Sequence, residues 1–174
     1  MKRGRAIGTG ALVVALGFCG TGAWTYAQAR TDEELAFGRE RDTALAEGRS
    51  RLTVLNTLDA STPERAEAGI RAWRDASTGP LRTELGRTRP TVGASARATV
   101  TEAALTALDA RAGTAKLIAT VRVDVTPRGA AGATTDRKRL EAVLTRTGEN
   151  TWRVAALSAV PVAGAEKGEE GGDE

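Results

Sequence analysis

The chain has 174 residues and a formal net charge of +3, and its 41% hydrophobic and 27% charged residues are typical of a folded domain. It contains no histidine and one cysteine, which excludes His-dependent triads, zinc sites built on His or paired Cys, and an intramolecular disulfide. Aromatic residues make up only 3%, and the basic residues form no continuous stripe, which argues against a nucleic-acid surface and an aromatic-lined cofactor pocket. We therefore expect no cofactor, no metal site and no nucleic-acid partner.

The amino terminus predicts a membrane segment. Residues 6–29 carry no charge and follow Lys2, Arg3 and Arg5, and about 20 mostly apolar residues suffice to cross a bilayer. The basic residues would stay in the cytoplasm, so the rest of the chain would lie outside it. The side chains expected to contact lipid are Ile7, Leu12, Val13, Val14, Leu16, Phe18, Trp24 and Tyr26.

The same segment also fits a cleaved signal peptide. Ala27-Gln28-Ala29 has the A-x-A form of a cleavage site, and residues 11–19 could serve as the apolar region. Cleavage after Ala29 would give a secreted protein instead of one with a single-pass anchor. Both alternatives export the main body of the chain.

Helices are predicted first in that body. Thr31 and Glu34 form a capping box, and leucines that include Leu35, Leu45 and Leu52 fall on one stripe of a helix. Gly38 and Gly48 weaken this helix and could break it.

Two shorter helices should follow. Residues 61–64, Ser-Thr-Pro-Glu, are typical of a helix start, and residues 77–80, Ser-Thr-Gly-Pro, of a helix end. A third short helix over residues 81–86 would bury Leu81 and Leu85.

The hydrophobic period changes after residue 95. Alternation predicts strands over residues 117–125 and 139–145, a last strand that includes Trp152, Val154 and Leu157, and a weaker strand over residues 98–108. Short connections between them, with a hairpin tip at residues 129–134 and a turn at residues 147–150, imply an antiparallel meander with one face packed on the helices. The fold class is α+β.

The carboxyl end differs from the rest. Residues 166–174 hold five acidic residues and Lys167, a net charge of −4, and residues 163–174 have no apolar anchor, which predicts disorder. The expected organisation is a membrane anchor or signal peptide over residues 1–29, an exported domain over residues 30–162 and an acidic tail over residues 163–174.

This arrangement resembles the mammalian cell entry (Mce) associated membrane proteins of high-GC bacteria. The residues that carry the likeness lie at two helix ends and in two strands: Leu55-Asn56-Thr57-Leu58-Asp59, residues 77–82, Val121-Arg122-Val123-Asp124-Val125 and Thr151-Trp152-Arg153-Val154. The resemblance implies one amino-terminal span, an exported cone of the nuclear transport factor 2-like (cystatin-like) type, and an accessory or scaffolding role beside the subunits of an Mce-type lipid or sterol import system.

Several residues invite a functional interpretation. Trp73 and Trp152 could line a lipid-binding mouth, although packing between helix and sheet is the favoured interpretation. Asp59 is expected to make a helix-end hydrogen bond or turn, and Asp124 to pair with an arginine across strands. An isomerase-like or cyclase-like enzyme would need Asp59 or Asp109 in an apolar cavity with a proton donor, and the exported part has neither Tyr nor His. We therefore predict a non-enzymatic protein with no catalytic residues. A secreted cone that binds a small apolar ligand is the alternative.

Overall fold

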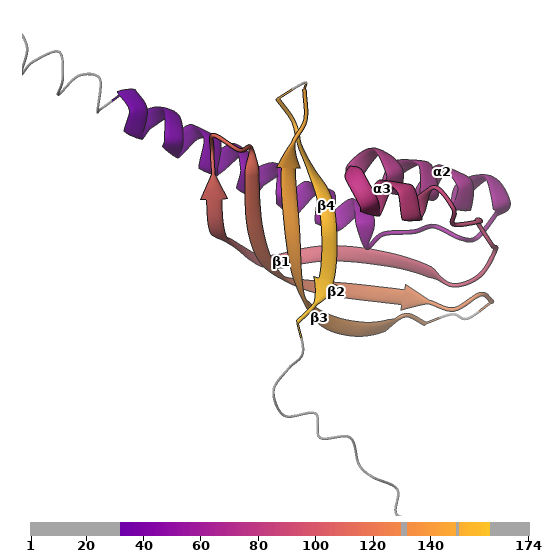
Figure 1. Ribbon diagram of the computed structural model, residues 1–174. Helices are drawn as coiled ribbons and strands as arrows, with labels where there is room; N and C mark the ends of the chain where they lie inside the picture. The colour runs from indigo at the N-terminus through magenta and orange to yellow at the C-terminus, as the bar shows by residue number, and fades with distance from the viewer. Residues whose placement is uncertain (1–31, 130–131, 149, 161–174) are drawn as a thin grey trace, which may run out of the picture. The chain divides into compact units, whose positions relative to one another are not determined.

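A computed structural model describes residues 32–129, 132–148 and 150–160 (Figure 1). The chain divides into two units between Glu40 and Arg41, and residues 32–40 are mostly exposed helical turns of the first unit. The predicted membrane segment with its lipid-contacting residues, and the acidic tail, lie outside the described residues. None of the helices within the described ranges combines the length and the hydrophobicity that a membrane crossing requires.

The first helix covers residues 32–55, and neither of its glycines breaks it. From Arg41 onward its buried positions recur every four residues, at Ala44, Gly48 and Leu52. This spacing is the helical repeat of a face packed on a sheet. Leu35, which was expected on the buried stripe, is 52% exposed. The prediction was wrong there because the buried positions begin at Ala44, in the second unit.

The second helix is α2 (Pro63–Ala76), as its start and stop signals predicted. The third helix is α3 (Gly79–Leu85), which begins two residues before the predicted range 81–86 because Gly79 and Pro80, predicted to end a helix, form its first turn. The Thr62 side chain caps α2 by accepting a hydrogen bond from the backbone N–H of Arg65. α3 packs on the last strand and on α2, and its Leu81 and Leu85 are half-buried rather than buried. The backbone N–H of Thr78, between the two helices, donates to the Val154 carbonyl at 2.9 Å.

Four strands form one antiparallel sheet in the order β1-β2-β3-β4, which confirms the predicted meander. They are β1 (Ser95–Asp109), β2 (Thr114–Thr126), β3 (Thr134–Arg146) and β4 (Trp152–Ala159). The strand expected to be weakest, β1, is the longest. Its register with β2 shifts at two bulges, one between Val100 and Glu102 and one between Leu105 and Ala107. These bulges return the less exposed positions to the same face, so the strand continues to Asp109. The turn at residues 147–150 closes with a hydrogen bond from the Asn150 N–H to the Thr147 carbonyl.

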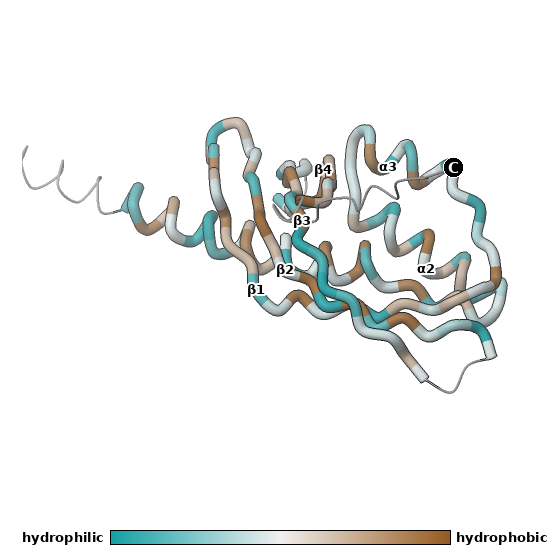
Figure 2. The backbone as a smooth tube through the Cα atoms, turned by 90° about the horizontal axis from the view of Figure 1, so that it is seen from below, coloured by the Kyte–Doolittle hydropathy of each residue, from teal (hydrophilic) through white to brown (hydrophobic). Residues whose placement is uncertain are grey.

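One face of the sheet builds the core with the first helix. Its buried side chains come from all four strands, and those that are fully buried include Leu117, Val121, Leu144, Trp152 and Val154. The first half of β3 differs, because residues 134–139 are all exposed. Figure 2 shows a hydrophilic stretch along this strand. The helix layer therefore supports β3 only from Leu140 onward.

Candidate functional site

The space between the first helix and the sheet is filled by side chains. Trp152 and Leu52 are wholly buried, as are Leu117 and Leu144 across the sheet. The Trp152 backbone N–H donates to Glu47 Oε2 on the helix at 2.7 Å, and the Arg146 guanidinium lies 5.9 Å from the centroid of the Trp152 ring. Trp152 is thus a core residue, as the favoured interpretation had it, rather than part of an open mouth.

Gly48 shows how closely the helix approaches the sheet. A Cβ atom at this position would lie 2.8 Å from Leu144 Cδ1 and 3.0 Å from Leu117 Cδ2. Carbon atoms in contact are ordinarily about 3.5–4.0 Å apart. The interior of the cone consequently has no room for a ligand at this level.

A surface groove lies instead between the end of the first helix and α2. Its volume is about 440 Å³, and most of its lining atoms are apolar. Small side chains on α2 leave this space open, and Leu58 packs against Gly69 beside it. The lining residues are Thr53, Val54, Thr57, Asp59, Arg65, Ala68, Gly69 and Ala72.

An ion pair forms part of the lining of this groove. Asp59 Oδ2 accepts from Arg65 Nη1 at 2.9 Å, and Asp59 Oδ1 accepts from the Ser61 hydroxyl at 2.6 Å and the Ser61 N–H at 3.0 Å. The hydrogen bonds from Ser61, together with Arg65, lower the pKa of Asp59 to about 2. The helix-end role predicted for Asp59 is confirmed, and the carboxylate is held ionised.

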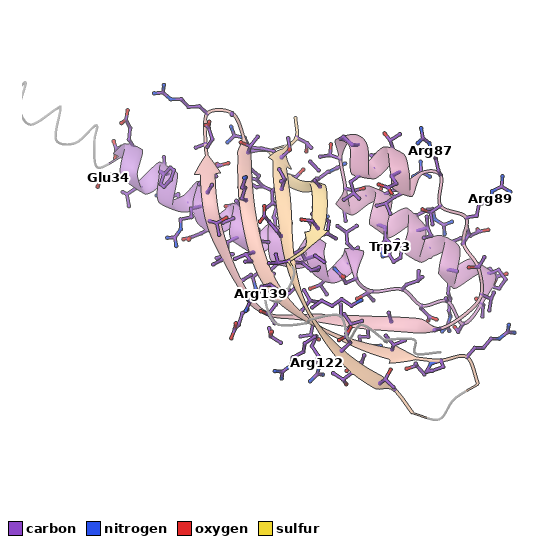
Figure 3. The ribbon with its side chains drawn as sticks, turned by 60° about the horizontal axis from the view of Figure 1, so that its bottom comes forward. Glu34, Trp73, Arg87, Arg89, Arg122 and Arg139 are labelled. Atoms are coloured by element: carbon purple, nitrogen blue, oxygen red, sulfur yellow. The ribbon has the colours of Figure 1, made fainter. Side chains whose placement is uncertain are left out.

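Trp73 joins α2 to the segment that follows the first helix. Its indole Nε1 donates to the Thr57 carbonyl at 2.8 Å, and its side chain is half-buried. Trp73 therefore ties together the two segments that form the groove (Figure 3).

The remaining acidic candidates also have structural surroundings. Asp109 accepts hydrogen bonds from the N–H groups of Arg111 and Ala112 in the β1–β2 turn. Asp124 lies directly across from Arg97 of β1, as expected, and Arg97 contributes to its lowered pKa. Its close ion pair, however, is with Arg122 of its own strand, at 3.2 Å, and Thr135 of β3 donates a 2.6 Å hydrogen bond to it. The hydrogen bond from Thr135, followed by Arg122, lowers the pKa of Asp124.

These carboxyl groups are poor general acids. Wherever a carboxyl pKa in the described residues is clearly displaced, at Asp59, Glu64 and Asp124, it is lowered. An isomerase-like site would need a carboxyl in apolar surroundings that raise its pKa. No cluster of three or more acidic or cysteine side chains able to hold a metal ion occurs in the described ranges.

Sequence reasoning found neither the groove nor a cationic cluster on the sheet. The groove residues are mostly Ala, Gly and Thr, which carry no chemical signal. The cationic cluster joins Arg122 of β2 to Arg137, Lys138 and Arg139 of β3, and the sequence shows only the last three as neighbours. That run of three cations was the available signal.

No protein-family model matches the sequence, and no curated protein matches it either. The chain is similar to CagV, a VirB8 homolog of the type IV secretion system of Helicobacter pylori, with a TM-score of 0.51 and 9% identity over 67% of this chain and 98% of CagV. An IcmL-like type IV secretion system protein of Legionella pneumophila gives a TM-score of 0.48 and 14% identity, over 73% of this chain and 96% of that one.

An Ntf2-like protein involved in plasmid conjugation gives a TM-score of 0.48 and 12% identity over 71% of this chain, which spans half of that structure. At such identities the likeness to CagV shows the fold alone. It agrees with the predicted α+β architecture of helices on a curled four-strand sheet. The resemblance to Mce-associated proteins gains no support from any family model.

Proposed function

We propose that the domain is a non-enzymatic scaffold that binds a protein partner, held outside the cytoplasm by the amino-terminal segment. The filled interior of the cone carries this proposal, because Trp152, Leu117 and Leu144 occupy the space in which related folds could hold a substrate. The lowered pKa values of Asp59 and Asp124 agree with it, since neither carboxyl is poised to exchange a proton near neutral pH.

The groove beside α2 is the proposed contact surface. It is apolar, lies on the surface, and is bordered by Asp59 and Arg65, which already pair with each other. An apolar helix or extended segment of a partner can bury its side chains there without leaving a charge unpaired.

Two kinds of assembly are candidates for the partner. The sequence resemblance points to an Mce-type lipid or sterol importer. The fold shared with CagV adds an assembly of the type IV secretion kind. In both cases the chain would act as an accessory subunit rather than as the transporter.

Affinity capture from detergent-solubilised membranes tests this proposal. Ala68 lines the groove and is exposed, so Ala68→Arg should leave the fold intact while blocking the surface, and co-purified partners should fall at least fivefold. Ala46→Arg is the matched control, because Ala46 is an exposed alanine of the first helix outside the groove. Equal recovery with both variants would refute the groove as the contact surface, and recovery of no envelope protein would refute the scaffold itself.

The alternative of a secreted apolar-ligand carrier is less well supported, because the filled interior leaves a ligand only open hollows on the surface of the described part of the chain. The intact mass of the native protein separates the two. Loss of residues 1–29 would exclude the anchor and favour the secreted form.

A further inference from the structure

Three adjacent cations mark the exposed first half of β3. Arg137 and Arg139 lie on the face of the sheet opposite the helices, because the neighbouring position Leu140 faces the core. Arg122 of β2 lies directly across from Arg137 on that same face, and Thr120 lies across from Arg139. Figure 3 shows Arg122 and Arg139 on this side of the sheet. Lys138 alternates to the opposite face, across from Val121. We call Arg122, Arg137 and Arg139, together with Lys138 between them, the basic edge.

The positive charge of the basic edge is only partly balanced. Arg122 shares Asp124 at 3.2 Å and Lys138 lies 4.0 Å from Asp136, whereas Arg137 and Arg139 form no ion pair within the described part of the chain. Like charges placed directly opposite across two strands, as Arg122 and Arg137 are, destabilise a sheet. A counter-anion would relieve this repulsion.

The same region has an open strand edge and a hollow. On the side away from β2, residues 134–138 pair with no described strand, because the register with β4 ends at Leu140 and Ala159. A hollow of about 270 Å³ lies beside Arg139 on the outer face, and it is also lined by Glu102, Thr120 and Ile118. The basic edge is therefore accessible from its side and from its face.

The carboxyl-terminal segment starts at this place. The Val160 N–H donates to the Arg139 carbonyl at 2.9 Å, and β4 runs antiparallel to β3, so the chain leaves Val160 in the direction of Lys138 and Arg137. The 14 residues from 161 to 174 can span at most about 50 Å, which is ample to reach every member of the basic edge. Residues 166–174 carry a net charge of −4.

We propose that the acidic carboxyl-terminal segment, residues 161–174, docks on the basic edge of its own domain. A short linker gives the tethered acidic residues an effective concentration on the order of millimolar, so even weak attraction keeps the edge occupied. The segment shields the open edge of β3, and any acidic partner must displace it.

A labelled peptide with the sequence of residues 161–174 tests the proposal, with fluorescence anisotropy measured on the full chain in detergent micelles. A chain that ends at Val160 should bind the peptide, and the intact chain should bind it at least about tenfold more weakly because its own segment competes. Binding should weaken steeply as salt is raised, since exposed charges are screened within about 8 Å at physiological ionic strength.

Charge reversal locates the site. In the shortened chain, Arg137→Glu with Arg139→Glu should weaken peptide binding at least tenfold. Arg87→Glu with Arg89→Glu makes the same change of charge at exposed residues after α3 and should alter binding less than twofold (Figure 3). Thermal melts confirm that each variant is folded.

Three outcomes would overturn the proposal. Equal peptide binding by the intact and the shortened chains would mean that the segment does not occupy the site. Equal losses of peptide binding in the two charge-reversal variants would mean that the peptide responds to the net charge of the domain and not to a site at the basic edge. If the peptide does not bind the shortened chain, the proposal is wrong, and the role that remains for these cations is to prevent the edge of β3 from pairing with another sheet.

Discussion

Replacement of Gly48 by alanine tests how tightly the first helix packs on the sheet. In an exposed helix, Gly→Ala stabilises by about 0.5–1 kcal/mol because alanine loses less backbone entropy on folding. At Gly48 the new methyl group would meet Leu144 Cδ1 at 2.8 Å and Leu117 Cδ2 at 3.0 Å, and both leucines are wholly buried. Overpacking of this kind costs about 1–3 kcal/mol.

The net expectation is a loss of about 0–2.5 kcal/mol in the free energy of unfolding, which is measured as a lower Tm in thermal melts of the full chain. Gly38→Ala is the matched control, since nothing lies within 4 Å of its added Cβ and its Tm should not fall.

In a chain that already carries Leu144→Ala, Gly48→Ala should raise the Tm instead of lowering it. Leu144→Ala alone costs about 2–5 kcal/mol because it leaves a cavity. The alanine at position 48 would then fill part of that cavity, so Gly48→Ala should raise the Tm of this variant. A Gly48→Ala substitution that stabilises both backgrounds equally would refute the close packing.

Three further substitutions test the groove and the cap of α2. The pKa of Asp59 is lowered to about 2, so Asp59 stabilises the fold above its unfolded pKa and loses this effect as pH falls. Asp59→Asn should flatten the fall in Tm between about pH 5 and 2, and an unchanged slope would contradict stabilisation of the ionised carboxylate by Ser61 and Arg65. Trp73→Phe removes the hydrogen bond to the Thr57 carbonyl and should cost about 0.5–1.5 kcal/mol in denaturant unfolding; no loss would show that solvent replaces it. Thr62→Ala should cost about 0.5–2 kcal/mol, whereas Thr62→Ser should be nearly neutral, and equal effects would argue against a capping role.

Local chemistry explains why α2 and most strands could be predicted. Thr62 and Pro63 mark a helix start in any context, and the alternation from Leu117 to Val125 fits a strand that is buried on one face. β1 was underestimated because its alternation is interrupted at two bulges, which only the pairing with β2 makes regular.

Glycine gave the opposite difficulty. Gly48 is a weak residue for an isolated helix, and from the sequence a break at this position was possible. In the tertiary structure the missing side chain is what lets the helix approach Leu144 and Leu117. A property that is unfavourable locally is compensated by contacts that no local pattern reveals.

The sequence by itself determined the α+β class, the meander of four strands, the start of α2 and the distribution of charge along the chain, because each depends on residues close together in the chain. Only the tertiary structure decided that Trp152 fills the interior, that an apolar groove opens beside Asp59, and that Arg122 joins Arg137 and Arg139. These features depend on strand register and on the distance between layers, which bring together residues that are far apart in sequence.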